Sequence, residues 1–418
     1  MRKIRDLAIS RLAISSLALI LIGFTQPATT AAAGLLVRGI AVGNSHSCAL
    51  STTGSVYCWG GNTFGQLGNG TLVTSPSPVP ALMGGVSFVS LTAGGNHTCG
   101  LTQAGSAYCW GLGNNGELGD GQRGAGHKAL QPTAVATTIR FSQLAAGARQ
   151  TCGISLAGPT YCWGSNTFGE LGIGTLTYGA PTYRTTPTKV QSGTNFIKIA
   201  SGFSHVCGVN SRLLIFCWGS NDSGQLGNGA SGNGSGDPGP ADRGVPVQVQ
   251  SRLRFTEISA SVGSTCAIST DRRTYCWGGN GDWGALGVGD TRERSLTPVQ
   301  VSTRETFVQL ESGFLHTCGV TAFGVASCWG ANEVGQLGNG DHDDSKSGSV
   351  HAELRPVFVA RNTNSRFITL SLGQEHSCGI TVEHKTYCWG SNTAGQLGNG
   401  VRDMTGGANQ DMPTEVQY

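Results

Sequence analysis

The sequence predicts an all-β protein, a seven-bladed β-propeller, from its repeats, their spacing and its composition. A cysteine is followed ten residues later by Cys-Trp-Gly, and this pattern occurs seven times at intervals of 51 to 60 residues. Glycine is abundant, at 66 residues, and only 12% of residues are charged, as expected for strands joined by tight turns. One such repeat cannot bury both faces of its own sheet, whereas seven repeats arranged radially bury every face against a neighbour.

The N-terminus is predicted to be a secretory signal peptide that covers residues 1–33. Basic residues between Arg2 and Arg11 precede an apolar stretch from Leu12 to Phe24, and small residues ending at Ala33 follow. This order is typical of a signal peptide, and the apolar stretch is shorter than a membrane span requires. An N-terminal anchor helix is the alternative. Residues 34–418 are then predicted to be a single propeller domain.

The charge balance argues against a nucleic-acid partner. Residues 1–33 hold four of the 27 basic residues and one of the 24 acidic residues, which leaves 23 of each in the rest of the chain. A protein that binds nucleic acid normally carries a basic surplus or a basic stripe. No apolar run after residue 33 is long enough to span a bilayer, so we expect no membrane span in the mature chain, and we expect a monomer.

All fourteen cysteines fall into the seven pairs, and we expect each pair to form a disulfide bond. Zinc ligands in such pairs lie two to four residues apart, so a constant spacing of ten argues against a metal. Disulfides behind a signal peptide indicate an oxidising destination, so the protein is predicted to be secreted, either extracellular or periplasmic. The expected bonds are Cys48–Cys58, Cys99–Cys109, Cys152–Cys162, Cys207–Cys217, Cys266–Cys276, Cys318–Cys328 and Cys378–Cys388.

The second repeat shows how one blade forms. Strands are expected at 88–91, 97–101 and 107–110, with Gly105 in the left-handed position of a three-residue hairpin loop. Such a loop places Cys99 directly opposite Cys109, close enough for a disulfide. Alternation along the strands then puts Tyr108 and Trp110 opposite small residues, which leaves a flat apolar face for the next repeat.

A fourth strand is expected from a Pro-and-Val segment late in each repeat, as at 187–190, 246–249, 298–301 and 413–416. The first repeat begins at Leu35 with no such segment before it. We therefore expect the C-terminal strand to pair with the N-terminal blade and close the ring, which would remove a sheet edge.

Three recurrent polar positions are expected to be structural. Histidines two residues before the first cysteine are expected to hydrogen bond between blades rather than to bind a metal. Asparagines three residues after the tryptophan and the glycines of Gly-Gln-Leu-Gly are expected in turns. A calcium site is an alternative for the acidic loop at 341–345, although this loop lacks the terminal glutamate of the common calcium motif. The histidines are His46, His97, His205, His316 and His376.

The repeats resemble those of the regulator of chromosome condensation repeat family. The shared pattern is Gly-x-x-His-(Ser/Thr)-x-x-Leu at 94–101, Tyr-x-Trp-Gly-x-Asn at 57–62, and Gly-Gln-Leu-Gly at 65–68. The resemblance implies a seven-bladed propeller. It also implies guanine-nucleotide exchange on a small GTPase with chromatin binding or, in secreted bacterial relatives, β-lactamase inhibition by docking on the propeller face. The paired cysteines depart from the nuclear members, and no residue here can be assigned an exchange role.

A protein partner is expected on the propeller face that carries the turns between first and second strands. Aromatic and apolar residues at turn tips have no evident core role and resemble interface anchors, although local packing is the alternative. The sequence therefore favours a secreted, non-catalytic propeller that binds or inhibits a protein, without cofactor, metal or catalytic residues. An exchange factor for a small GTPase is the alternative function, and an enzyme or lectin that uses the central channel has no supporting residues. The candidate partner-binding residues are Phe64, Phe168, Phe203, Trp283, Phe314 and Leu315.

Overall fold

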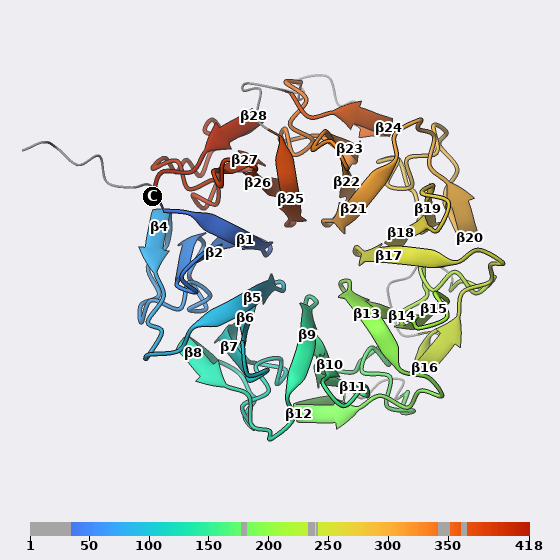
Figure 1. Ribbon diagram of the computed structural model, residues 1–418, viewed down its shortest axis with the longest axis horizontal. Coiled ribbons are helices and arrows are strands. Elements are labelled where there is room, and N and C mark those ends of the chain that lie inside the picture. Colours follow the sequence, from blue (N-terminus) through green and yellow to red (C-terminus); the bar gives the residue numbers. More distant parts are fainter. Residues whose placement is uncertain (1–34, 177–181, 233–238, 240, 342–351, 361–365) are drawn as a thin grey trace, which may run out of the picture. The chain divides into compact units, whose positions relative to one another are not determined.

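Seven four-stranded antiparallel sheets surround a common centre in the unit Leu35–Tyr418 (Figure 1). The computed structural model describes residues 35–176, 182–232, 239, 241–341, 352–360 and 366–418, so the predicted signal peptide lies outside the described residues. Every regular element in the described ranges is a strand. The expected all-β, seven-bladed propeller is confirmed.

Each blade consists of four strands that are consecutive in the sequence, numbered from the centre outwards. The innermost strands are β1 (Val37–Val42), β5 (Phe88–Ala93), β9 (Phe141–Ala146), β13 (Phe196–Ser201), β17 (Phe255–Ala260), β21 (Phe307–Ser312) and β25 (Phe367–Leu372). The second strands are β2 (His46–Ser51), β6 (His97–Thr102), β10 (Gln150–Ser155), β14 (His205–Asn210), β18 (Ser264–Ser269), β22 (His316–Thr321) and β26 (His376–Thr381).

The third strands carry the Cys-Trp-Gly triplets, and the fourth strands form the rim. The third strands are β3 (Val56–Gly60), β7 (Ala107–Leu112), β11 (Thr160–Ser165), β15 (Ile215–Gly219), β19 (Thr274–Gly279), β23 (Ala326–Ala331) and β27 (Thr386–Gly390). The fourth strands are β4 (Ser75–Pro80), β8 (Lys128–Ala134), β12 (Tyr183–Lys189), β16 (Arg243–Gln248), β20 (Arg294–Gln300), β24 (Ala352–Phe358) and β28 (Gln410–Glu415).

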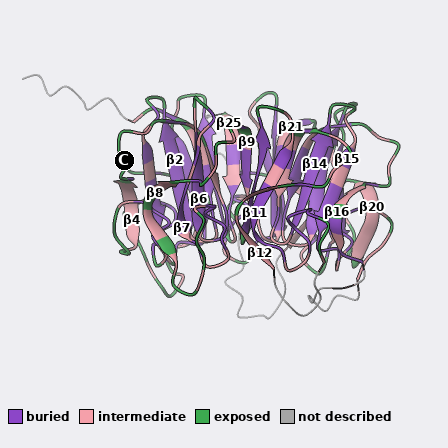
Figure 2. Ribbon diagram, turned by 90° about the horizontal axis from the view of Figure 1, so that it is seen from below, coloured by how far each residue is buried: buried purple, intermediate pink, exposed green. Residues whose placement is uncertain are grey.

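Burial follows the order of the strands. The second strands are almost entirely buried, whereas the fourth strands are mostly half-buried (Figure 2). Strands covered on both faces read as near-continuous small and apolar residues, and rim strands tolerate polar residues and proline because one edge is free. None of the described segments forms a helix long and apolar enough to cross a membrane.

The seven expected disulfides are present, each between the second and third strands of one blade. In the second blade, Cys99 lies directly opposite Cys109 with their Cα atoms 4.1 Å apart. The same register places Tyr108 opposite Gly100 and Trp110 opposite Thr98, as the alternation predicted. The described residues contain no free cysteine.

The hairpin between these two strands requires a left-handed residue six positions after the first cysteine. Gly105 occupies this position with φ +78°, as expected. Three blades place a non-glycine residue there instead, and Leu213, Arg272 and His384 have φ values of 60° to 62°. A side chain in this conformation is strained, so these three turns are less favourable than the glycine turns.

Neighbouring blades are joined by the tryptophans. Trp110 Nε1 of the second blade donates a hydrogen bond to the carbonyl oxygen of Gln66 in the first, at 3.0 Å. A Cβ atom on Gly68 would lie 2.8 Å from Trp110 Nε1, so the ring fits only against a glycine. Gly65 and Gly68 both have positive φ, which confirms the expectation that Gly-Gln-Leu-Gly forms a turn.

The expected pairing of the C-terminal strand with the N-terminal blade is wrong. β28 pairs with β27 inside the last blade, and β4 supplies the fourth strand of the first blade. The segment between Gly68 and Ala81 already contains this strand, so the first repeat lacks nothing.

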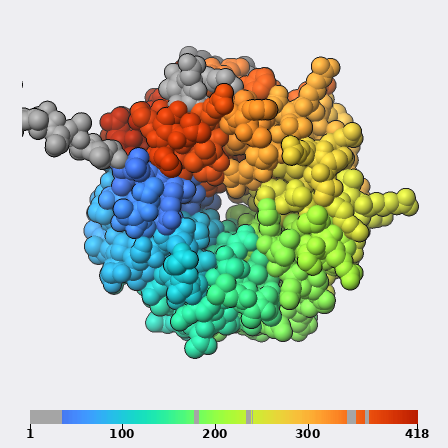
Figure 3. All heavy atoms as spheres, viewed as in Figure 1, coloured from blue at the N-terminus to red at the C-terminus, as the bar shows by residue number. Residues whose placement is uncertain are grey.

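Side-chain contacts between the first and last blades close the ring instead (Figure 3). Trp59 Nε1 donates to Gln396 O at 2.8 Å, which repeats the contact seen at the other blade boundaries. Tyr418 extends this contact, because its ring meets Trp59 edge-on with centroids 6.0 Å apart while its hydroxyl donates to Thr386 Oγ1.

Candidate functional site

Two sets of connections lie on the same side of the sheets because the strands alternate in direction. These are the turns from first to second strand and the loops from third to fourth strand. The turns surround one end of the central channel. We call this side the mouth face.

Backbone hydrogen bonds connect neighbouring turns at the channel mouth. Gly95 N donates to Gly147 O at 3.2 Å, Phe203 N donates to Ser261 O at 3.0 Å, and Asn44 N and Phe314 N make the same kind of contact, so four of the seven turns are fastened to the turn of the next blade. A Cβ atom on Gly94 would lie 2.2 Å from Gly147 O, which explains the glycine that begins most of these turns. The mouth is therefore a rigid frame for the variable residues that follow.

Two of the predicted anchor residues meet at this mouth. Phe203 comes from the β13–β14 turn and Phe314 from the β21–β22 turn, with the turn of one blade between them. Their rings make an edge-to-face contact with centroids 6.0 Å apart and an angle of 89°. Both are half-buried, and Phe314 is followed by the half-buried Leu315. The pair belongs to none of the hydrophobic clusters between blades.

The other predicted anchors lie on separate loops of the mouth face. Phe64, Phe168 and Trp283 belong to the loops after β3, β11 and β19, and all three are half-buried. Phe64 N donates to Gln66 Oε1 at 2.9 Å, and Phe168 N donates to Glu170 Oε2 at 2.7 Å, so these two positions are tied into their own loops. The structure therefore brings Phe203 and Phe314 together in one contact, and it places the other three in different blades.

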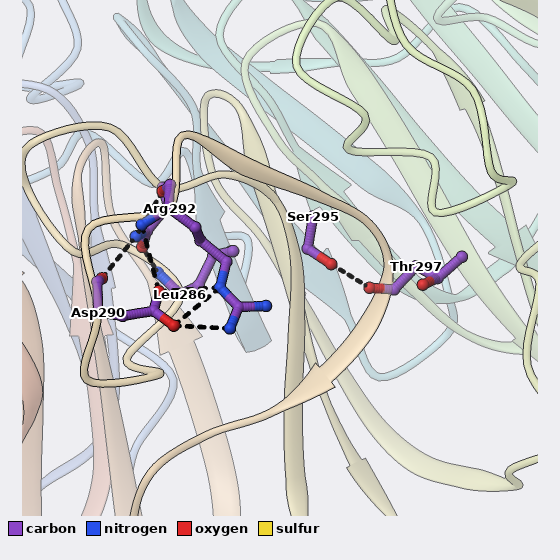
Figure 4. Close-up of polar contacts among 6 residues, drawn as sticks. Leu286, Asp290, Arg292, Ser295 and Thr297 are labelled. Carbon is purple, nitrogen blue, oxygen red and sulfur yellow. Dashed lines mark hydrogen bonds and ion pairs between the residues drawn. The ribbon is translucent and has the colours of Figure 1, made fainter.

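The loop after β19 and the strand that follows it, β20, are braced by local contacts (Figure 4). Arg292 donates to the carboxylate of Asp290 through Nε and Nη2 at 2.8 and 2.6 Å, and Ser295 Oγ donates to Thr297 O at 2.8 Å. Both charged side chains are exposed, so this pair adds little to stability. It adds charged groups to the loops of the mouth face.

The recurrent histidines connect the blades, as expected. His46 Nε2 is 2.8 Å from Thr98 Oγ1 of the next blade, and the Thr98 hydroxyl donates to Gln66 O. The hydroxyl therefore accepts from the imidazole, which fixes the neutral tautomer with hydrogen on Nε2. Burial lowers the pKa of His46 to about 3, with the nearby His97 adding to the shift. Gln150 replaces histidine in the third blade and donates to Ser201 Oγ.

The loop asparagines make side-chain hydrogen bonds to segments that are longer than the local turn expected from the sequence. Asn62 Oδ1 accepts from Leu67 N at 3.0 Å, while its Nδ2 donates to Thr71 O and Val73 O. One side chain therefore organises most of the loop after β3. Of the acidic loop considered for calcium, Asp341 is described and the segment 342–345 lies outside the described residues. No group of three or more metal-binding side chains is found in the part of the chain that the structure describes.

The central channel contains charged residues that the sequence reasoning missed. Residues of all seven innermost strands line a cavity of about 310 Å³, and they include Lys198 and Glu257 at the third positions of their strands and Glu311 at the fifth. Lys198 Nζ is paired with Glu257 Oε2. Polar residues at these alternating positions of the first strand were the available sequence signal.

Comparison with known proteins gives a consistent family assignment. The sequence family described as the RCC1-like domain matches residues 23–278 and 124–417. The ultraviolet-B receptor UVR8 of Arabidopsis thaliana is 30% identical over 368 residues, which cover 86% of this chain and 78% of that protein. The human E3 ubiquitin-protein ligase HERC2 is 27% identical over 358 residues, but these cover only 7% of its length.

Solved structures agree on the fold. Prp20p of Saccharomyces cerevisiae superposes with a TM-score of 0.75 at 21% identity and covers 88% of this chain and 87% of its own. Human WBSCR16 superposes with a TM-score of 0.73 at 17% identity, covering 87% of this chain and 95% of its own. At these identities the likeness concerns the fold alone.

Proposed function

Since this chain belongs to the RCC1-like domain family, we propose that it is an exported, non-catalytic propeller that binds a protein partner through its mouth face. The single observation that carries the proposal is the contact between Phe203 and Phe314. Large aromatic side chains left half-exposed on a rigid frame are typical of interface hot spots. Leu315 and the neighbouring Val262, both half-buried, extend the apolar surface around the pair.

Export is the second part of the proposal. It is supported by the seven disulfides, one in every blade, and by the order of basic, apolar and small residues in 1–33. A reducing cytosol would leave fourteen thiols between the blades, whereas an oxidising compartment makes each pair a covalent staple. The proposed destination is extracellular or periplasmic.

A capture experiment from the native extracellular or periplasmic fluid tests the binding face. The mature protein carrying Phe203→Ala and Phe314→Ala is compared with wild type and with Phe323→Ala. Phe323 is 75% exposed in the β22–β23 turn, on the opposite side of the sheets, so it removes an equal ring away from the mouth. We expect a partner that wild type and Phe323→Ala retain and that the double variant loses.

Two other outcomes of this experiment would contradict binding at the mouth face. If Phe323→Ala loses the partner and the double variant keeps it, the binding face is the one opposite the mouth. A double variant that melts well below wild type would instead assign the pair to the fold.

Regulation of a small GTPase is the alternative function, because the RCC1-like family includes exchange factors. Prp20p, which has been studied for its binding to Gsp1p and histones, shares the fold with this chain. The disulfides disfavour a cytosolic role. Measurement of nucleotide release from a panel of small GTPases tests this alternative, and accelerated release by wild type that mouth variants abolish would favour it.

A further inference from the structure

The central channel carries more negative than positive charge. Lys198, Glu257 and Glu311 are the charged side chains among the described residues that line its cavity of about 310 Å³. Lys198 and Glu257 pair with each other. Glu311 is then a carboxylate without a counter-charge in this lining.

Glu311 is held so that it faces the cavity. Its Oε1 accepts a hydrogen bond from Gln309 Nε2 at 3.1 Å, and the same amide donates to Thr369 Oγ1 of the next blade at 3.0 Å. Burial, with a smaller contribution from the charge of Glu257, raises the pKa of Glu311 to about 7 against the opposing effect of the Gln309 hydrogen bond. A buried carboxylate of this kind is stabilised when a cation enters beside it.

The entrance to this cavity is aromatic. The mouth and the cavity share one lining residue from each blade, Ser201 and Ser312 among them, so they are successive sections of one channel. Phe203 and Phe314 lie at the mouth. Aromatic rings above a carboxylate form an environment that recognises organic cations.

The spacing along the chain sets the size of the ligand. Glu311 and Phe314 are three residues apart, and the chain turns after β21 ends at Ser312, so their separation along the chain is at most roughly 10 Å. An ammonium group beside Glu311 would therefore leave a chain of about five or six carbons reaching toward the rings.

We propose that the channel binds a primary alkylammonium group, with its nitrogen at Glu311 and its alkyl chain packed against the Phe203–Phe314 pair. Two sources have this chemistry, a free aliphatic amine and a lysine side chain presented by another protein. The proposal does not depend on the identity, or the existence, of a protein partner.

Calorimetric titration of the mature, disulfide-bonded protein with n-hexylammonium chloride tests the proposal, with n-hexanol as the neutral control. We expect saturable binding of the amine and none of the alcohol. Glu311→Gln, which keeps the shape and loses the charge, should weaken amine binding at least tenfold. Glu305→Gln is the matched control, because it removes the same charge from a loop outside the cavity lining, and it should bind as wild type does.

A second variant keeps the test decisive if Glu311→Gln is unstable. Lys198→Met frees the carboxylate of Glu257, so it should bind the amine more tightly than wild type. Absence of amine binding to wild type, or equal affinities for Glu311→Gln and Glu305→Gln, would overturn the proposal. So would weaker binding by Lys198→Met.

A competition experiment with peptides distinguishes the two sources, a free amine and a lysine side chain. Acetyl-Gly-Lys-Gly-amide and its norleucine analogue are titrated in competition with n-hexylammonium. Competition by the lysine peptide alone assigns the site to a lysine side chain. Failure of both peptides, with the amine still bound, assigns it to a free amine.

Discussion

Trp110 donates its indole hydrogen to the carbonyl oxygen of Gln66 across the boundary between the first two blades, at 3.0 Å. The Thr98 hydroxyl donates to the same oxygen at 3.2 Å, so this one carbonyl oxygen accepts two hydrogen bonds from the neighbouring blade. The equivalent indole contact occurs at every blade boundary, including the one between the last blade and the first.

Loss of this contact should destabilise the ring. Trp110→Phe removes the indole donor and leaves space beside Gly68, at a site that is fully buried. We expect the free energy of unfolding in guanidinium to fall by about 2–4 kcal/mol, from the lost hydrogen bond and the cavity together. Trp283→Phe is the control, because Trp283 lies outside the blade boundaries, and it should change stability by less than about 1 kcal/mol. Equal effects of the two changes would contradict this role for the indole.

The buried histidines should make the propeller sensitive to acid. Burial lowers the pKa of His97 to about 4, below its usual value of 6.5, so the folded state stays neutral while the unfolded state takes up a proton. The stability contributed by neutral His97 is complete above pH 6.5 and is lost as the pH falls from 6.5 toward 4.

His97→Gln tests this dependence, because Gln150 already replaces the histidine in the third blade. The free energy of unfolding is measured between pH 7.5 and pH 5. We expect the variant to lose less stability over this range than wild type, by up to about 1.4 kcal/mol per pH unit below 6.5. An unchanged slope would show that the pKa of His97 is the same in the folded and unfolded states.

Glu117 should oppose folding above neutral pH. It stands where four other blades have a buried glutamine, and burial raises its pKa from 4.5 to about 7 despite hydrogen bonds from Asn115. A raised pKa means that stability is complete below pH 4.5 and falls as the pH rises toward 7.

The variant Glu117→Gln removes this penalty and keeps the acceptor for Asn115 N. At pH 8 we expect it to be more stable than wild type by about 1–3 kcal/mol, with little difference at pH 4.5. Thermal melts at the two pH values measure the effect. A variant that is less stable at pH 8 would mean that Glu117 makes an ionic contact worth more than its burial costs.

Strain in the hairpin turns can be relieved at Arg272. This exposed residue has φ +62° at the position that glycine occupies in four blades. Arg272→Gly should raise stability by up to about 1 kcal/mol, because glycine adopts this conformation without strain. Arg273→Gly, at the next position, should lower stability because it adds only unfolded-state entropy. The denaturant midpoints of the two variants show whether each change raises or lowers the stability.

The repeats made most of the fold predictable. Constant spacing fixed each cysteine opposite its partner, and the glycine six residues after Cys99 indicated the turn that puts it there. Ring closure was predicted wrongly, because the fourth strand of the first blade, Ser75–Pro80, was not identified: it carries Pro-x-x-Val at 76–79, but three prolines in six residues are unfavourable to a strand. A proline-rich rim strand has weak sequence signals, since its outer edge needs no partner.

The candidate site was predictable only in part. Phe203 and Phe314 could be selected because they lie at the tips of turns. No local sequence pattern, however, shows that these two residues, 111 positions apart, contact each other. The channel carboxylate of Glu311 was missed for the same reason, because its isolation depends on the pairing of Lys198 with Glu257 from two other strands. Such features arise from ring geometry, which brings seven innermost strands around one axis.

Hydrogen–deuterium exchange on the complex with the captured partner tests the binding face most directly. We expect the partner to slow exchange in the mouth turns, at 202–204 and 313–315, and to leave exchange in the opposite turn around Phe323 unchanged. Protection confined to the turns between second and third strands, with the mouth turns exchanging as in the free protein, would contradict it.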